Sequence, residues 1–197
     1  MKELTTDDVT KLLSEISLWP QILLENYFSV ALGLRKCSLN TIPAEYPDGV
    51  KIAESVDKAS IDEYRALTME KDPKRKLQLI EQMKRNIRQE FQRNLDRSDA
   101  YKAHLKWVDA LGLSHYQMEV RPSIREVFLF KDESVRKQLE KLSKKRERYR
   151  SESVRESGGG IARPRIIYPE DFKPDYVTEM SVLLGYPPCC TDAYVQG

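Results

Sequence analysis

Apolar side chains recur at intervals of three and four residues along most of this chain, the periodicity of helices that bury one face. The clearest case begins at Asp72-Pro73 and continues to residue 97. Its apolar positions are Leu77, Ile80, Met83, Ile87, Phe91 and Leu95. The same pattern predicts helices over residues 20–32, 61–70, 99–111, 132–149 and 174–184, one that starts at Thr6, and a short last helix after residue 188.

Start and stop signals and short alternating runs complete the pattern. Ser60 and Glu63 form a capping box, and Gly185 is typical of the position after a helix. Residues 116–120 alternate and residues 127–130 are β-prone, which predicts a hairpin, with a helix capped by Ser123 as the alternative. Residues 37–49 are rich in turn formers and predict a loop, whereas residues 50–56 fit a short strand or a helical turn equally.

These elements predict a predominantly helical α+β fold with about seven helices and a small sheet or hairpin. The 197 residues suit a single domain over residues 1–197. Ser, Gly and Arg dominate residues 151–165, which predicts a flexible loop. The last predicted helix is barely two turns long at the point where the sequence stops. Such a short last helix is expected when the C-terminus of a chain is truncated.

Charge is segregated along the chain, although the net charge is only +2. Residues 71–106 carry 11 basic and 5 acidic side chains, and residues 131–165 carry 12 and 6. Acidic residues dominate the segments 1–70 and 166–197. This distribution predicts either a localised positive face or pairing between acidic and basic segments in the fold.

Cysteine content and hydropathy indicate the compartment. The 3 cysteines do not form a disulfide framework, which is typical of a reducing environment. The chain has neither a run of about 18 apolar residues nor a signal-peptide pattern. We therefore expect a cytoplasmic protein that does not enter the membrane.

Familiar catalytic signatures do not occur: the chain has no P-loop, dinucleotide-binding glycine motif, zinc-protease motif or nucleophile elbow. Of its 2 histidines, His104 is expected at the boundary of a helix and His115 in a loop, and neither is favoured as a catalytic base. Three cysteines without a fourth ligand do not make a tetrahedral metal site, so no metal ligand is assigned and the cofactor stays open.

Residues 183–190 are the sharpest local feature of the sequence. A helix stop, the rigid Pro187-Pro188 elbow and a helix start place two thiols at a helix N-terminus. Exposed N–H groups and the helix dipole favour a thiolate there, so Cys189 and Cys190 are candidate catalytic residues, with Tyr186 lining a pocket. The alternative is that the two cysteines pack as small apolar side chains.

The run Gly185-Tyr186-Pro187-x-Cys189-Cys190 after a hydrophobic helix resembles a family of archaeal proteins that is classed as a domain of unknown function. The resemblance covers residues 183–190, and the Gly-rich, Arg-bearing stretch before it and the chain length are compatible with it. It implies an archaeal cytoplasmic protein. It brings no established activity, cofactor or catalytic residue.

Two further segments are candidates for binding anions. Gly158, Gly159 and Gly160 would let backbone N–H groups approach an anion, and the guanidinium groups of Arg163 and Arg165 suit phosphate or carboxylate. The alternative for this stretch is a plain flexible linker.

The second segment is the basic helix near residues 132–150. Its side chains Lys144, Lys145 and Arg148 could follow a nucleic-acid backbone. The alternative is a solvated helix face, because acidic residues are interleaved and no nucleic-acid-binding signature is present.

The sequence therefore favours a pocket for a phosphorylated or carboxylated small molecule, formed where the loop 158–165 meets the elbow 185–190. Thiol-dependent transfer or hydrolysis is the preferred chemistry, and whether the protein is an enzyme stays open. The alternative is a non-catalytic nucleic-acid-binding protein that uses the helix 132–150. A helical scaffold without small-molecule chemistry is the third hypothesis, and the sequence does not determine the oligomeric state.

Overall fold

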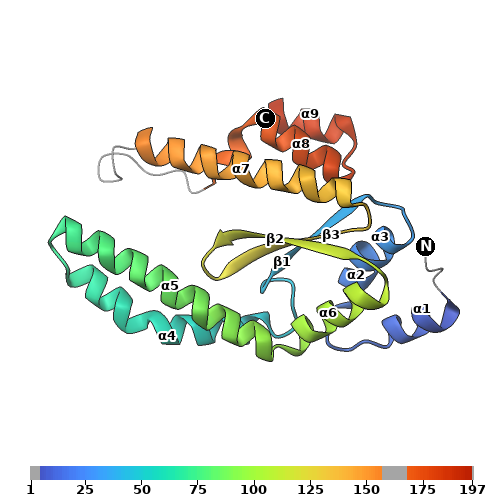
Figure 1. Ribbon diagram of the computed structural model, residues 1–197, viewed down its shortest axis with the longest axis horizontal. Coiled ribbons are helices and arrows are strands. Elements are labelled where there is room, and N and C mark those ends of the chain that lie inside the picture. Colours follow the sequence, from blue (N-terminus) through green and yellow to red (C-terminus); the bar gives the residue numbers. More distant parts are fainter. Residues whose placement is uncertain (1–4, 157–167, 197) are drawn as a thin grey trace.

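The computed structural model describes residues 5–156 and 168–196, and Figure 1 shows a small sheet between two groups of helices. The elements in the N-terminal half are α1 (Thr6–Leu13), α2 (Pro20–Ile22), the π-helix η1 (Leu23–Phe28), α3 (Ser29–Ala31), β1 (Cys37–Ile42), α4 (Gly49–Met69) and α5 (Pro73–Arg97). Those that follow are α6 (Asp99–Ala110), β2 (Ser114–Arg121), β3 (Ile124–Phe130), α7 (Glu133–Glu156), the 3-10 turn η2 (Pro169–Phe172), α8 (Pro174–Leu184) and α9 (Pro188–Gln196).

The sheet is antiparallel with the strand order β1-β3-β2, and β2 and β3 form the predicted hairpin. Helices cover both of its faces: α7, α8 and α9 lie on one side, and α2 to α6 lie on the other (Figure 1). The predominantly helical α+β fold is thus confirmed.

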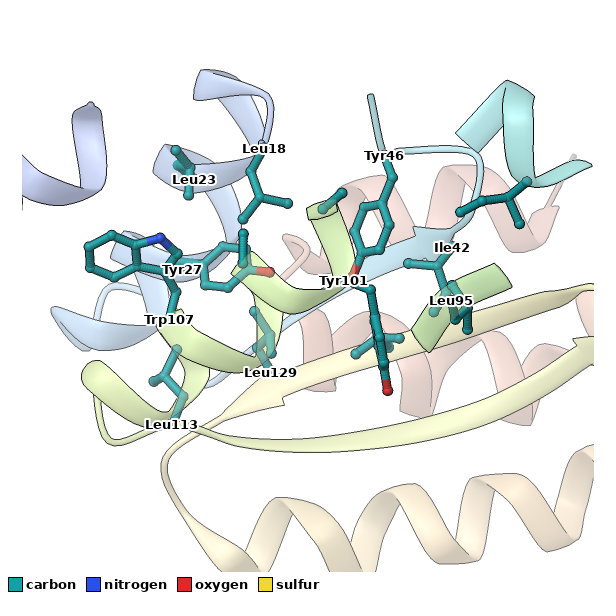
Figure 2. Close-up of a cluster of buried hydrophobic side chains, with 14 of the residues drawn as sticks. Leu18, Leu23, Tyr27, Ile42, Tyr46, Leu95, Tyr101, Trp107, Leu113 and Leu129 are labelled. Carbon is teal, nitrogen blue, oxygen red and sulfur yellow. The ribbon is translucent and has the colours of Figure 1, made fainter. Parts of the chain in front are cut away.

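The central strand β3 divides the interior into two cores. Val127 and Leu129 belong to the first core, on the side of α2 to α6, and Phe128 and Phe130 belong to the second core, under α7 and α8. All four are completely buried, because successive side chains of a strand point to opposite faces and both faces are covered by helices. Figure 2 shows part of the first core, where side chains from the π-helix, β1, α6 and β3 converge.

Strand β1 corrects the loop predicted over residues 37–49. The prediction rested on the turn formers from Pro43 onward, which do follow the strand. The strand itself lacks apolar alternation because two polar residues point into the interior: Ser38 Oγ donates to the carbonyl oxygen of Asn26, and Asn40 accepts a hydrogen bond from the Asn26 side chain. Polar side chains therefore occupy interior positions that are usually apolar in a strand, and the sequence shows no alternating pattern there.

Two helix boundaries also differ from the sequence prediction. Helix α4 starts at Gly49, so residues 50–56 are helical and Ser60 lies inside the helix, where its Oγ donates to the carbonyl oxygen of Val56 at 2.9 Å. Helix α7 continues to Glu156, so residues 151–156 of the expected flexible loop are helical. Residues 157–165 of that loop lie outside the described residues.

Candidate functional site

The elbow between α8 and α9 folds as its sequence predicts. Gly185 ends α8 with a left-handed φ of +78°, and the amide of Tyr186 donates to the carbonyl oxygen of Ser181 at 2.9 Å, a Schellman-type ending. Pro188 then starts α9, so that Cys189 and Cys190 lie in its first turn. Both cysteines are exposed, which contradicts the alternative that they pack in the core.

The two helices and the turn η2 enclose a groove of about 430 Å³, which we call the α8–α9 groove. Two of the predicted site residues, Tyr186 and Cys190, lie on its wall. The complete lining is Asp171, Tyr176, Val177, Met180, Ser181, Leu184, Tyr186, Cys190, Thr191 and Tyr194. The elbow therefore contributes to a cavity, and its main partner in the described residues is α8.

The chemistry of the α8–α9 groove is mainly apolar and aromatic, with few polar groups. Asp171 carries the single carboxyl group on its described wall, and the pKa of this group is raised by burial and by the nearby carboxylate of Glu170. No lysine or arginine of the described residues lines this groove. The predicted anion-binding residues Gly158, Gly159, Gly160, Arg163 and Arg165 lie outside the described part of the chain.

The two thiols of the elbow interact with each other. A hydrogen bond with Cys189 raises the pKa of Cys190, because the bond stabilises the protonated thiol. This direction is opposite to the lowering of the pKa that the sequence predicted for a thiol at a helix N-terminus. Cys37 is buried in β1, where burial raises the pKa of its thiol to about 12.

A buried ion cluster lies directly behind the groove, and sequence reasoning missed it. Arg146 of α7 donates from Nε to the hydroxyl of the groove residue Tyr176 at 3.0 Å, and from Nη2 to Glu126 at 2.6 Å. Arg146 Nε is also 3.3 Å from the carboxylate of Glu170, which accepts a further bond from Arg150 Nε at 3.0 Å. We call Glu126, Arg146, Arg150 and Glu170 the Arg146 cluster.

One signal in the sequence could have found this cluster. The buried positions of α7 are Val135, Leu139, Leu142, Arg146 and Tyr149, spaced four, three, four and three residues apart. An arginine on that stripe is directed at the interior, where it requires carboxylate partners. The position of Arg146 on this stripe therefore indicates a buried ion pair, which its charge alone does not.

The structure separates the three predicted nucleic-acid contacts. Lys144 and Arg148 are exposed on α7. Lys145 instead forms ion pairs with Asp175 at 2.8 Å and with Glu179 at 2.7 Å, which tie α7 to α8. Lys145 therefore belongs to the packing between these helices.

The histidines occupy different positions from those expected. His104 is completely buried in α6, and His115 lies in strand β2. Tyr27 Oη is 2.6 Å from His104 Nδ1, and His104 Nε2 is 3.0 Å from His115 Nδ1. Burial lowers the pKa of His104 to about 3, with a smaller contribution from His115. Neither histidine lines the α8–α9 groove.

Comparisons with known proteins add no relative: no family model matches the chain, and no curated protein or solved structure matches it. Within residues 5–156 and 168–196, no group of three or more His, Cys, Asp or Glu side chains is placed to hold a metal ion. In the same residues, no helix has the length and apolar character needed to cross a bilayer.

Proposed function

We propose that this protein binds a small organic molecule in the α8–α9 groove and that the thiol of Cys190 contacts the bound molecule. The observation that carries the proposal is the position of Cys190 and Tyr186 on the wall of a cavity of about 430 Å³. Sites for small molecules are usually concave, mainly apolar and between about 300 and 1,000 Å³. The cavity meets each of these conditions.

The lining indicates the kind of molecule. Tyr186 and Tyr194 offer aromatic surface that is more than half exposed, with relative exposures of 58% and 64%. Such surface favours a flat or aromatic body in the ligand. The hydroxyls of Ser181 and Thr191 and the carboxyl of Asp171 supply the few polar contacts that would orient it.

The sequence further predicts a phosphate or carboxylate on the ligand, recognised by Arg163 and Arg165. The described wall of the groove carries a carboxyl and no cation, so recognition of an anion depends on these two arginines. The proposal therefore separates into a groove that binds the body of the ligand and an arginine pair that selects its charge. Each part has its own test.

The test is a binding screen by ligand-detected NMR with aryl phosphates, aromatic carboxylates and their neutral analogues. Bound compounds are then tested for protection of Cys190 against iodoacetamide, read by peptide mass spectrometry with buried Cys37 as the internal reference. We expect at least one compound to slow the alkylation of Cys190 in a saturable way. A screen without any protecting compound contradicts the proposal.

Two variants on α8 make the screen specific. Ser181→Phe fills the groove, whereas Val182→Phe adds the same ring one residue away, where the side chain is 68% exposed and outside the groove lining. We expect Ser181→Phe to abolish binding and protection and Val182→Phe to leave both intact. The double variant Arg163→Gln/Arg165→Gln is expected to weaken only the charged compounds; an equal effect on neutral analogues would contradict the anion-selecting role.

A further inference from the structure

A straight row of cations lies on the face of α7 that points away from the sheet. Its members follow each other at intervals of four, three and four residues, so they share one side of the helix. They are Lys137, Lys141, Lys144 and Arg148, and all are exposed. The buried stripe of α7 lies on the opposite side, which anchors the row on a rigid element packed against the sheet (Figure 1).

Most of this cation row is not neutralised by acidic neighbours. Among the described residues, Lys137, Lys141 and Lys144 form no ion pair. Arg148 has one long ion pair, 3.7 Å from Glu152, and its guanidinium group also lies 4.8 Å from the centre of the Tyr149 ring. Lys145, by contrast, is held by two carboxylates of α8 at 2.7–2.8 Å. Glu140 lies three residues after Lys137 and four before Lys144, and Glu147 lies three residues after Lys144, so both are neighbours of the row, but neither forms an ion pair with it among the described residues.

We infer that this cation row binds the phosphate backbone of a double-stranded nucleic acid without regard to sequence. From Lys137 to Arg148 the row extends roughly 17 Å along the helix axis, at a rise of about 1.5 Å per residue. A rigid line of cations of this length follows a charged backbone and needs no contact with base edges. This activity is separate from the α8–α9 groove and does not depend on it.

Two features favour a duplex over the other polyanions. Single-stranded nucleic acids are usually bound by aromatic platforms, and the one aromatic residue of α7, Tyr149, is buried in the second core. A membrane surface requires apolar side chains beside the cations, and the apolar stripe of α7 is covered by the sheet and α8. The cation row therefore presents only charged groups, and the helix holds them in a line.

The strength of the effect follows from counterion release. With four phosphate contacts, the slope of log Kobs against log salt is about −3.6 for duplex DNA, so affinity falls roughly 150-fold between 50 and 200 mM salt. Each cation removed from the row should make the slope less steep by about 0.9. A cation that does not touch the backbone should leave the slope nearly unchanged.

The experiment is fluorescence anisotropy with the full chain and labelled duplexes of mixed sequence, one of DNA and one of RNA, over a range of salt concentrations. We expect Lys144→Gln to reduce the slope by about 0.9, and the variant with all four cations replaced by Gln to lose binding. The matched control is Lys58→Gln, the same change of charge on the exposed surface of α4. Lys145→Gln, beside Lys144 in the sequence, tests whether an ion-paired cation contributes.

Several results would overturn the inference. They are a lack of duplex binding at 50 mM salt, an equal change of slope in Lys58→Gln and Lys144→Gln, and tighter binding to single strands, to a polyglutamate peptide or to anionic vesicles. Thermal unfolding of each variant identifies losses that arise from misfolding. Ser181→Phe, which closes the groove, is expected to bind the duplex normally, so the failure of one proposal is distinguishable from the failure of the other.

Discussion

Arg146 of α7 is joined by ion pairs to β3 and to η2. The residue is 6% exposed, and its guanidinium group lies between the carboxylates of Glu126 and Glu170, a residue that is 1% exposed. Attraction between charges is strong in such a site, but it has to offset the cost of removing all of them from water. The cluster is therefore sensitive to the loss of a single member.

Arg146→Ala is expected to reduce the free energy of unfolding by about 3–5 kcal/mol, because it leaves Glu126 without its cation and Glu170 with Arg150 alone. The control is Arg148→Ala, two residues away, whose side chain is 57% exposed and which should change stability by less than about 0.5 kcal/mol. Urea unfolding followed by circular dichroism measures both. Equal losses in the two variants would contradict a special role for the Arg146 cluster.

At the scale of elements, the short connection between α8 and α9 decides the shape of the candidate site. The left-handed backbone of Gly185 turns the chain, and the two prolines that follow restrict where α9 can start. Cys190 and Tyr194 reach the groove only because α9 packs back along α8 in this orientation. The groove is thus a property of the helix pair and of its turn.

Gly185→Ala is expected to cost about 1–2 kcal/mol, since a φ of +78° is unfavourable for a residue with a Cβ atom. No atom lies within 4 Å of the position of that Cβ, so the cost comes from the backbone alone. Gly185→Asn is the control, because Asn tolerates the left-handed region and should restore part of the loss. Thermal unfolding ranks the three proteins; a melting temperature of the Ala variant equal to that of the wild type would show that the turn is not strained.

At the scale of the whole molecule, a chain of polar rings crosses the first core. Tyr27 comes from the π-helix, His104 from α6 and His115 from β2, so the contacts join the π-helix to two consecutive elements that are far from it in the sequence. The rings of His104 and His115 are stacked nearly parallel. The ring of Tyr101 also stacks on that of His104. Burial lowers the pKa of both histidines, and the charge of Arg136 on α7 adds to the lowering at His115.

This arrangement predicts that stability falls as the pH falls below about 6.5. The unfolded chain binds a proton at His104 near its ordinary pKa of 6.5, whereas the folded protein resists protonation down to about 3, so the contribution is complete above 6.5 and is lost progressively toward 3. His104 alone accounts for roughly 2 kcal/mol between pH 7 and pH 5. The pKa values of Glu15 and Asp175 are lowered to about 2 from ordinary values of 4.5 and 3.8, so these carboxylates contribute little in that window.

Urea unfolding at pH 7 and pH 5 measures this dependence. His104→Gln should reduce the difference between the two pH values, whatever its effect on stability at pH 7. Tyr27→Phe removes the hydroxyl and keeps the buried imidazole, so a substantial pH dependence should persist. An undiminished difference in His104→Gln would exclude this histidine as the source.

The elements that the sequence predicts correctly are those whose conformation depends on residues close together in the chain. The helix 73–97, the helix 174–184 with its glycine ending, the hairpin and the helix start at the two cysteines are all correct, because periodicity and capping depend on residues a few positions apart. Strand β1 is different, since its polar residues Ser38 and Asn40 form hydrogen bonds with Asn26, which no local pattern reveals.

By itself the sequence determined the helical α+β class, the elbow at residues 185–190 and the residue types that could act there. Only the tertiary structure decided that Cys190 lies on the wall of a groove, that Lys145 is paired while Lys144 is exposed, and that Arg146 and His104 are buried. The reason is that burial and ion pairing depend on contacts between residues far apart in the chain. A helix pattern specifies which side chains share a face, and the packing of that helix on the sheet and on α8 decides what each face touches.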